Sequence, residues 1–283
     1  MTTARSILVL CRISNLPTVF ANVLAAWFLG GGSWDNRLAL AALGAALCYS
    51  GGMILNDVFD ADWDRQHRKP RPIPEGWISR TTAAWLGWVA LGTGVGIFLA
   101  LRSNPLWAAG LAAGIIFYNH LHKTWSGSIW LMGACRFFLF ITVASIPAVS
   151  LPLRVWLWGM ALAGYVAGIT LAARNENTGG KMHPEALAWL LLPAGCACYF
   201  LPEPGHELTW PLLVAVLFCL WVLWAHRRLH SGRIALGSFV AQLIAGMVFV
   251  DAMGLSTVFP HGSLLCLSLL PLNLFLQVFI PAT

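Results

Sequence analysis

Charge is scarce in this chain of 283 residues. Only 10% of the residues are Asp, Glu, Lys or Arg, whereas 58% are hydrophobic, and the mean hydropathy is +0.73. A soluble globular domain typically carries about 25% charged residues. The composition therefore excludes an ordinary soluble domain and predicts an all-α integral membrane protein.

Two common kinds of site are also missing from the sequence. The seven cysteines lie mostly in apolar runs, without the paired spacing of metal ligands or a disulfide framework, so we expect small core residues. Neither a P-loop nor a G-x-G-x-x-G motif occurs. No soluble nucleotide-binding domain is expected, and residues 1–283 are interpreted as a single polytopic transmembrane domain.

Long apolar runs predict a bundle of about nine, that is nine or ten, transmembrane helices. The candidate spans are Leu16–Leu29, Leu38–Asn56, Ala83–Leu101, Pro105–Leu121, Ile129–Leu151, Val155–Ala173, Ala186–Leu201, Leu208–Ala225, Ile234–Val250 and Leu264–Ile280. Several are short, so a break or a re-entrant piece changes the count by one. Three glycine pairs have spacing suited to close helix contact: Gly92/Gly96, Gly110/Gly114 and Gly164/Gly168.

The basic residues indicate the orientation. Thirteen of the seventeen lie at the N-terminus or in alternate connections between the spans, and the opposite side has only Arg37, Arg102 and Arg154. The positive-inside rule places the first side in the cytoplasm. The topology thus explains the net charge of +6. No nucleic-acid partner is expected, because a protein that binds nucleic acid clusters its basic residues on a soluble fold.

Most of the aspartates lie in one short segment. NDVFDADWDRQHRKPRP, residues 56–72, holds four of the six aspartates. If the second span stays helical past Asn56, then Asp57, Asp60 and Asp64 share one helix face, and Asp62 points elsewhere. Three carboxylates on one face repel each other unless a cation binds between them. Hard oxygen ligands of this kind suit Mg²⁺, which commonly also binds substrate phosphates.

A diphosphate is therefore the expected ligand of this segment. Arg68, Lys69 and Arg71 can donate charge-assisted hydrogen bonds to its oxygens. The alternative is an acidic and basic cytoplasmic loop that binds no ligand.

The same residues resemble a known family. N-D-x-x-D-x-x-x-D at residues 56–64, RPIPEG at 71–76 and RISNLPT at 12–18 resemble the first signature of the UbiA superfamily of intramembrane prenyltransferases. MGACR at 132–136, YVAGITLAARNENTGG at 165–180 and DA at 251–252 resemble its EboC-like branch. The resemblance implies a helical bundle around a lipid-open central cavity, with Mg²⁺ and an isoprenyl diphosphate at the cytoplasmic end, in a multi-pass protein of a bacterial inner membrane.

Residue chemistry and resemblance together predict the site. The predicted catalytic residues and metal ligands are Asp57, Asp60, Asp64 and Glu176. The predicted substrate-binding residues are Asn15, Asn56, Arg68, Lys69, Arg71, Tyr118, Lys123, Arg174, Asn175 and Lys181. For Asn15, a hydrogen bond between helices is the alternative to a place in the cavity.

One departure from the family pattern concerns the second aspartate motif, D-x-x-x-D, expected after the sixth helix. That position reads Arg174-Asn175-Glu176-Asn177, so only Glu176 is a carboxylate. In one interpretation Glu176 and an adjacent Asn hold a metal ion, while Arg174 and Lys181 neutralise phosphate directly. In the other, Arg174 and Lys181 are ordinary basic residues at the membrane surface.

The predicted function is prenyl transfer from a Mg²⁺-bound isoprenyl diphosphate to an unidentified acceptor. The alternative is a non-catalytic lipid or metabolite carrier, or a biosynthetic accessory protein, that keeps only the first diphosphate site. Arg136 and Asp251 lie in or beside apolar spans, where an unpaired charge is unfavourable. We expect them to pair with each other, or at least one of them to line the cavity.

Overall fold

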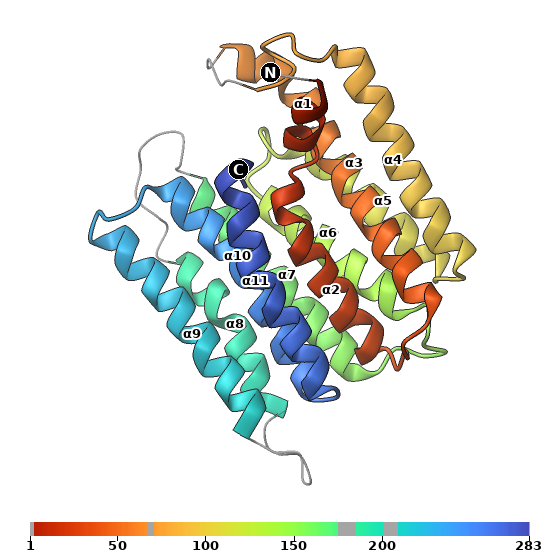
Figure 1. Cartoon of the computed structure of the whole chain (residues 1–283), viewed down its shortest axis with the longest axis vertical. Helices are drawn as coiled ribbons and strands as arrows, with labels where there is room; N and C mark the ends of the chain where they lie inside the picture. Colours follow the sequence, from red (N-terminus) through yellow and green to blue (C-terminus); the bar gives the residue numbers. More distant parts are fainter. Residues whose placement is uncertain (1–2, 67–70, 175–184, 201–208, 283) are drawn as a thin grey trace.

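The computed structural model describes residues 3–66, 71–174, 185–200 and 209–282, and every regular element in these ranges is a helix (Figure 1). The elements are α1 (Thr3–Leu10), the 3₁₀ turn η1 (Ile13–Asn15), α2 (Leu16–Leu29), α3 (Asn36–Gln66), α4 (Arg80–Ala100), α5 (Pro105–Leu121), α6 (Ser128–Ala144), α7 (Leu153–Ala173), α8 (Glu185–Phe200), α9 (Thr209–His230), α10 (Leu236–Ser256) and α11 (Pro260–Phe279).

The helices agree closely with the candidate spans in position. In the described ranges, six helices are long and apolar enough to cross a membrane, and α1 with η1 and α2 forms a seventh candidate, bent by 51°. Helices α6 and α8 are apolar but shorter. The chain is thus an all-helical membrane protein, while nine or ten crossings stay a prediction.

Two boundaries differ from those expected from hydropathy. Helix α3 continues to Gln66, ten residues past the end of the predicted span at Asn56, so all four aspartates of the acidic segment lie on a helix. Helix α6 ends at Ala144 rather than near Leu151. Pro147 follows within one turn, and proline lacks the N–H group that a continuing helix needs.

Helix α2 lies at the centre of the bundle and contacts α3, α6, α10 and α11. Most of the apolar windows of α7 and α10 are buried, 72% and 67%, compared with 28% for both α4 and α9. These last two helices lie at opposite edges of the bundle in Figure 1. Their exposed side chains, such as Trp85 and Leu220, are therefore suited to contact lipid.

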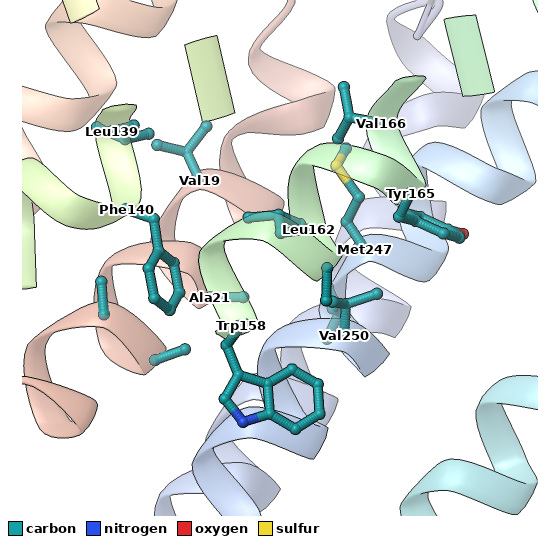
Figure 2. Close-up of a cluster of buried hydrophobic side chains, with 14 of the residues drawn as sticks. Val19, Ala21, Leu139, Phe140, Trp158, Leu162, Tyr165, Val166, Met247 and Val250 are labelled. Atoms are coloured by element: carbon teal, nitrogen blue, oxygen red, sulfur yellow. The ribbon is translucent and has the colours of Figure 1, made fainter. Parts of the chain in front are cut away.

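The main core forms where α2, α6, α7 and α10 meet (Figure 2). Val19, Phe140, Trp158 and Met247 lie together there, each at most 5% exposed. Tyr165 is also fully buried, and its hydroxyl donates a hydrogen bond of 2.8 Å to the backbone oxygen of Leu243. This core fixes the helices that surround the site described below.

Glycine allows α3 and α4 to pack backbone against backbone. A Cβ at Gly94 would lie 2.7 Å from the backbone oxygen of Gly44, and a Cβ at Gly51 would lie 2.8 Å from that of Gly87. Each glycine pair on one helix is spaced by seven residues, about two turns, so all four lie on the contact faces.

Two of the three predicted glycine pairs face another helix. Gly110 and Gly114 face α6, and Gly164 and Gly168 face α8, as predicted. The prediction for Gly92 and Gly96 is wrong, because a Cβ at either position would meet nothing within 4 Å. Their spacing matches that of a contact pair, but they lie on the outer face of α4.

Gly94→Ala should lower the thermal unfolding midpoint of the detergent-solubilised protein, because α3 and α4 must separate to admit the methyl group. We expect a loss of about 1–3 kcal/mol of stability, typical of an overpacked core. Gly92→Ala, on the open face of the same helix, is the matched control, and we expect it to be neutral or slightly stabilising. Equal midpoints for the two variants would contradict the close helix contact.

Candidate active site

Three aspartates lie on one buried face of the last turns of α3. The residue exposures are 3% for Asp57, 8% for Asp60 and 2% for Asp64. Asp62 points outward instead and pairs with Arg80 at 2.9 Å. The helical phase predicted from the sequence is therefore correct for all four residues.

Arg71 bridges two of these carboxylates. Its Nη1 lies 2.5 Å from Asp57 Oδ1, and its Nε lies 3.3 Å from Asp64 Oδ2. The second contact is an ion pair without hydrogen-bond geometry, so Asp64 Oδ2 is buried with no hydrogen-bond partner in the described structure. Burial alone would lower the pKa of Arg71, but the charges of Asp57 and Asp64 outweigh it and raise the pKa.

The third carboxylate is paired from α5 and the residues that follow it. Lys123 Nζ lies 2.7 Å from Asp60 Oδ1, and His122 Nε2 lies 3.2 Å from the same oxygen. Lys123 also lies over the ring of Trp63, 4.1 Å from its centroid. The end of α5 therefore brings positive charge to the acidic face of α3.

Amide side chains join α3 to α5 just below the carboxylates. Asn119 donates to the backbone oxygen of Gly52 at 3.1 Å and accepts from Asn56 Nδ2 at 3.2 Å. Asn56, predicted to bind substrate, thus makes a contact between helices. This contact holds α5 in register with the acidic segment.

The N-terminal segment and the last described residues meet at the same end of the bundle. Arg12 Nη2 lies 3.8 Å from Asp57, and its Nη1 donates to the backbone oxygen of Ala282 at 3.1 Å. Asn15 Nδ2 donates to the same oxygen at 3.0 Å and to Tyr49 Oη at 3.2 Å. Asn15 therefore makes hydrogen bonds between separate parts of the chain. This agrees with the alternative given from the sequence, a hydrogen bond between helices.

An apolar cavity of about 60 Å³ begins beside the acidic face. Tyr118 and Asn119 line it from α5, Tyr49 and Gly52 from α3, and Arg136 from α6. Tyr118 also stacks on His122, with 5.1 Å between ring centroids. A separate groove of about 950 Å³ lies between α6, α7 and α8 and shares none of these lining residues.

The comparison with models of known protein families assigns the chain to a family. The model described as the UbiA prenyltransferase family matches residues 15–236. The chain belongs to the UbiA prenyltransferase family. The matched region includes the acidic face of α3 and all of its basic partners except Arg12.

Curated relatives in the UbiA family support this assignment over part of their length. The digeranylgeranylglyceryl phosphate synthase of Methanopyrus kandleri is 29% identical over 164 residues, which are 56% of this chain and 58% of that protein. The protoheme IX farnesyltransferase of Bacillus licheniformis is 31% identical over 119 residues, 40% of this chain and 38% of the relative. The chain thus spans less than two thirds of the length of these curated relatives.

Solved structures of UbiA proteins share the fold over nearly their whole length. A UbiA homolog from Archaeoglobus fulgidus bound to GPP and Mg²⁺ superposes with a TM-score of 0.63 at 17% identity, covering 89% of this chain and 99% of that one. A UbiA homolog from Aeropyrum pernix in its apo form gives 0.61 at 21% identity, covering 86% and 96%. The similarity establishes a UbiA-type fold.

The donor set of this UbiA protein is chemically suited to Mg²⁺. Asp57, Asp60 and Asp64 offer buried carboxylate oxygens, and Asp64 Oδ2 has no hydrogen bond. In the described ranges, however, no three His, Cys, Asp or Glu side chains converge closely enough to enclose a metal ion. Arg71 lies between Asp57 and Asp64, and Lys123 contacts Asp60, so we expect a bound metal ion to displace these two side chains.

The structure does not test several of the predicted site residues. Arg68, Lys69, Asn175, Glu176 and Lys181 lie outside the described residues. Arg174 is described and exposed, and its Nη2 donates to the backbone oxygen of Ser126 in the connection between α5 and α6. The structure thus gives Arg174 a role in joining two connections.

Sequence reasoning missed three residues of the site, and the first is Arg12, which lies 3.8 Å from Asp57. The second is His122, which contacts Asp60. The third is Asn119, which joins α3 to α5. The position of His122 and Asn119 at the end of a predicted span, beside Lys123, was the available signal.

Arg71→Met should destabilise the protein in the absence of Mg²⁺, because Asp57 and Asp64 would be buried without a counter-charge. Removing one partner of a buried ion pair costs about 3–5 kcal/mol. Mg²⁺ should restore more stability to this variant than to the wild type, since the cation can take the place of the guanidinium. The thermal unfolding midpoint with and without Mg²⁺ measures both effects.

Arg80→Met is the matched control. Arg80 pairs with Asp62, whose side chain is 63% exposed, and exposed pairs contribute only about 0–1 kcal/mol. If both variants unfold at the same temperature, and Mg²⁺ shifts both equally, then Arg71 does not compensate the buried carboxylates.

Proposed function

We propose that the chain is a Mg²⁺-dependent prenyltransferase that moves an isoprenyl chain from its diphosphate to an acceptor. The observation that carries the proposal is the buried face of Asp57, Asp60 and Asp64. The partner of Asp60, His122, stacks on Tyr118 in the lining of an apolar cavity. Family membership supports the proposal. So do two related structures, UbiA homologs from Archaeoglobus fulgidus bound to GPP or DMAPP with Mg²⁺.

In this proposal the three aspartates hold the metal ion, which supplies positive charge to the diphosphate oxygens when bound. Arg12, Arg71 and Lys123 surround the same carboxylates and would donate charge-assisted hydrogen bonds to the diphosphate. Their present pairing with aspartate keeps the site neutralised before substrate arrives. Glu176, Asn175, Arg68, Lys69 and Lys181 remain proposed partners of the same group.

The reaction needs a dry site. The bond between the first prenyl carbon and the diphosphate oxygen breaks, and the diphosphate keeps the electron pair. The acceptor then supplies the electron pair for the new bond and loses a proton. Leu111, Ile115 and Met132 line the cavity and exclude water from the allylic cation, and Tyr118 presents an aromatic ring to the same space.

Substrate entry requires the bundle to open. The cavity of about 60 Å³ is far below the roughly 300 Å³ at which ligand pockets begin. The backbone contact between α3 and α4 is close, whereas α5 meets α3 through the side chains of Asn56 and Asn119. Movement of α5 would widen the cavity and release Lys123 from Asp60.

The finer topology belongs to the same proposal. The chain forms one domain with nine or ten crossings in a bacterial inner membrane, and the acidic face lies on the cytoplasmic side. The contacts of Arg12 and Asn15 with Ala282 bring both ends of the described chain to the same end of the bundle, which supports the even count of ten. The EboC-like branch stays a prediction.

The decisive experiment is Mg²⁺-dependent diphosphate release by the purified protein from dimethylallyl, geranyl and longer prenyl diphosphates, with phenolic and lipid acceptors present. Asp60→Asn should lower release at least about a hundredfold, because it removes a ligand from the metal and a counter-charge from Lys123. Glu176→Gln tests the position of the second aspartate motif. If this variant also loses diphosphate release, Glu176 is the one carboxylate of that motif that still acts in the reaction.

Asp62→Asn is the matched control. It lies on the same helix, points away from the site and pairs with Arg80, so we expect release at the wild-type rate. If the wild type binds a prenyl diphosphate but never releases diphosphate across the acceptor panel, the transferase proposal fails. A non-catalytic carrier then becomes the better account.

A further inference from the structure

The groove of about 950 Å³ between α6, α7 and α8 has the size of a ligand site. Its volume lies within the roughly 300–1,000 Å³ of typical ligand pockets. Among the described residues, no charged side chain lines it. Leu153 and Met160 of the lining are 62% and 61% exposed, so the groove opens toward the lipid that surrounds the bundle.

Small residues on two helices create this recess. Ala134 of α6 and Gly164 of α7 both line it. A Cβ at Gly164 would clash with Leu192, so α8 packs directly against α7 there. Helix α8 meets α6 through Trp130 and Trp189, whose rings lie edge to face with 4.7 Å between centroids. These two rings belong to the lining and close one end of the groove.

The length of the groove matches one lipid chain. The lining extends along α8 from Trp189 to Tyr199 and along α7 from Leu153 to Gly164. At 1.5 Å per residue these stretches are about 15 and 16 Å long. The hydrocarbon core of a bilayer is about 30 Å thick, so the groove spans about one leaflet. Leu153 and Tyr199 mark the end that lies nearest the membrane surface.

A positive charge lies at this surface end. Arg154 directly follows Leu153 and precedes the lining residues Leu157 and Ala161 by three and seven positions, so it shares their side of α7. Its Nε is buried and has no hydrogen-bond partner among the described residues. A buried donor without an acceptor costs about 1–3 kcal/mol. An anion bound here would therefore remove an unfavourable interaction.

The start of α7 favours an anion for a second reason. Its N-cap position is Pro152, which supplies no side-chain hydrogen bond to the first turn. The N–H groups at a helix N-terminus attract negative charge. Arg154 is the second residue of this helix, so the guanidinium and the first turn can act on the same ligand.

Charge distinguishes a lipid from a second copy of the chain in the groove. A symmetric dimer would place the same surface on both sides, and this surface offers no carboxylate to Arg154 among its described lining residues. A phospholipid supplies both missing parts, because its phosphate accepts N–H bonds and its acyl chain fills the apolar recess. Basic recesses between transmembrane helices bind lipid head groups in this way.

We propose that the groove is a binding site for an anionic phospholipid. One acyl chain lies between α6, α7 and α8, and the phosphate accepts charge-assisted hydrogen bonds from Arg154. The lipid fills the space between α6 and α8 beyond the contact of Trp130 with Trp189, and thereby stabilises this side of the bundle. The site is separate from the cavity beside the acidic face, since the two share no lining residue.

Lipid retention by the purified full chain in detergent tests the proposal. Phosphatidylglycerol is offered against phosphatidylcholine with the same acyl chains, whose choline neutralises the phosphate, and bound lipid is counted by native mass spectrometry. The wild type should prefer phosphatidylglycerol. Arg154→Gln should weaken phosphatidylglycerol binding at least about tenfold, the effect of losing a charge-assisted hydrogen bond, and should leave phosphatidylcholine binding unchanged.

Arg102→Gln is the matched control for charge. Arg102 is exposed and is expected on the same side of the membrane, but it does not belong to the groove. This variant should retain phosphatidylglycerol as the wild type does. If Arg154→Gln loses no more phosphatidylglycerol than Arg102→Gln, the inference is overturned.

Two variants that fill the groove test the place of the acyl chain. Ala134→Phe and Met160→Trp add bulk to the lining and should weaken the binding of both lipids. The thermal unfolding midpoint without added lipid identifies the variants that fold, and Met160 is 61% exposed, so its replacement should be tolerated. Unchanged lipid binding in the folded variants overturns the inference. So does a change from dimer to monomer with lipid still bound, because the groove would then hold a second copy.

Discussion

Charges buried in an apolar bundle must be compensated, and this constraint organises the functional end of the molecule. Asp57, Asp60 and Asp64 cannot be buried together on α3 unless positive groups lie against them. Arg71 and Arg12 reach them from the segments after α3 and before α2, and Lys123 reaches them from the end of α5. The carboxylates thereby draw three separate parts of the chain to one point.

The same compensation makes the site responsive to ligands. The basic side chains that neutralise the aspartates are those that would bind phosphate, so a metal ion and a diphosphate can exchange partners with them without leaving a charge unpaired. Arg71 is held more tightly than Lys123, because it bridges two carboxylates. The end of α5 is therefore the natural part to move when substrate enters.

The apolar cavity is lined by Arg136 and by Tyr118, whose ring stacks on the Asp60 partner His122. A prenyl chain has no group that would bind the carboxylates beside His122, whereas a metal ion with a bound phosphate does. Arg136 does not form the ion pair with Asp251 expected from the sequence, and Asp251 accepts a hydrogen bond from Asn22 instead.

Periodicity and composition alone determined where most of the helices lie along the chain and which face of α3 carries the acids, because both follow from local geometry along one chain segment. Only the tertiary structure decided that Arg71 bridges Asp57 and Asp64, that His122 joins Lys123 at Asp60, and that Arg136 stays out of reach of Asp251. The glycine pairs show the same division, since Gly92/Gly96 and Gly110/Gly114 have equal spacing and yet only the second pair meets another helix. Spacing describes one helix, whereas pairing depends on how helices distant in sequence approach and rotate, and those positions are set by the packing of the whole bundle.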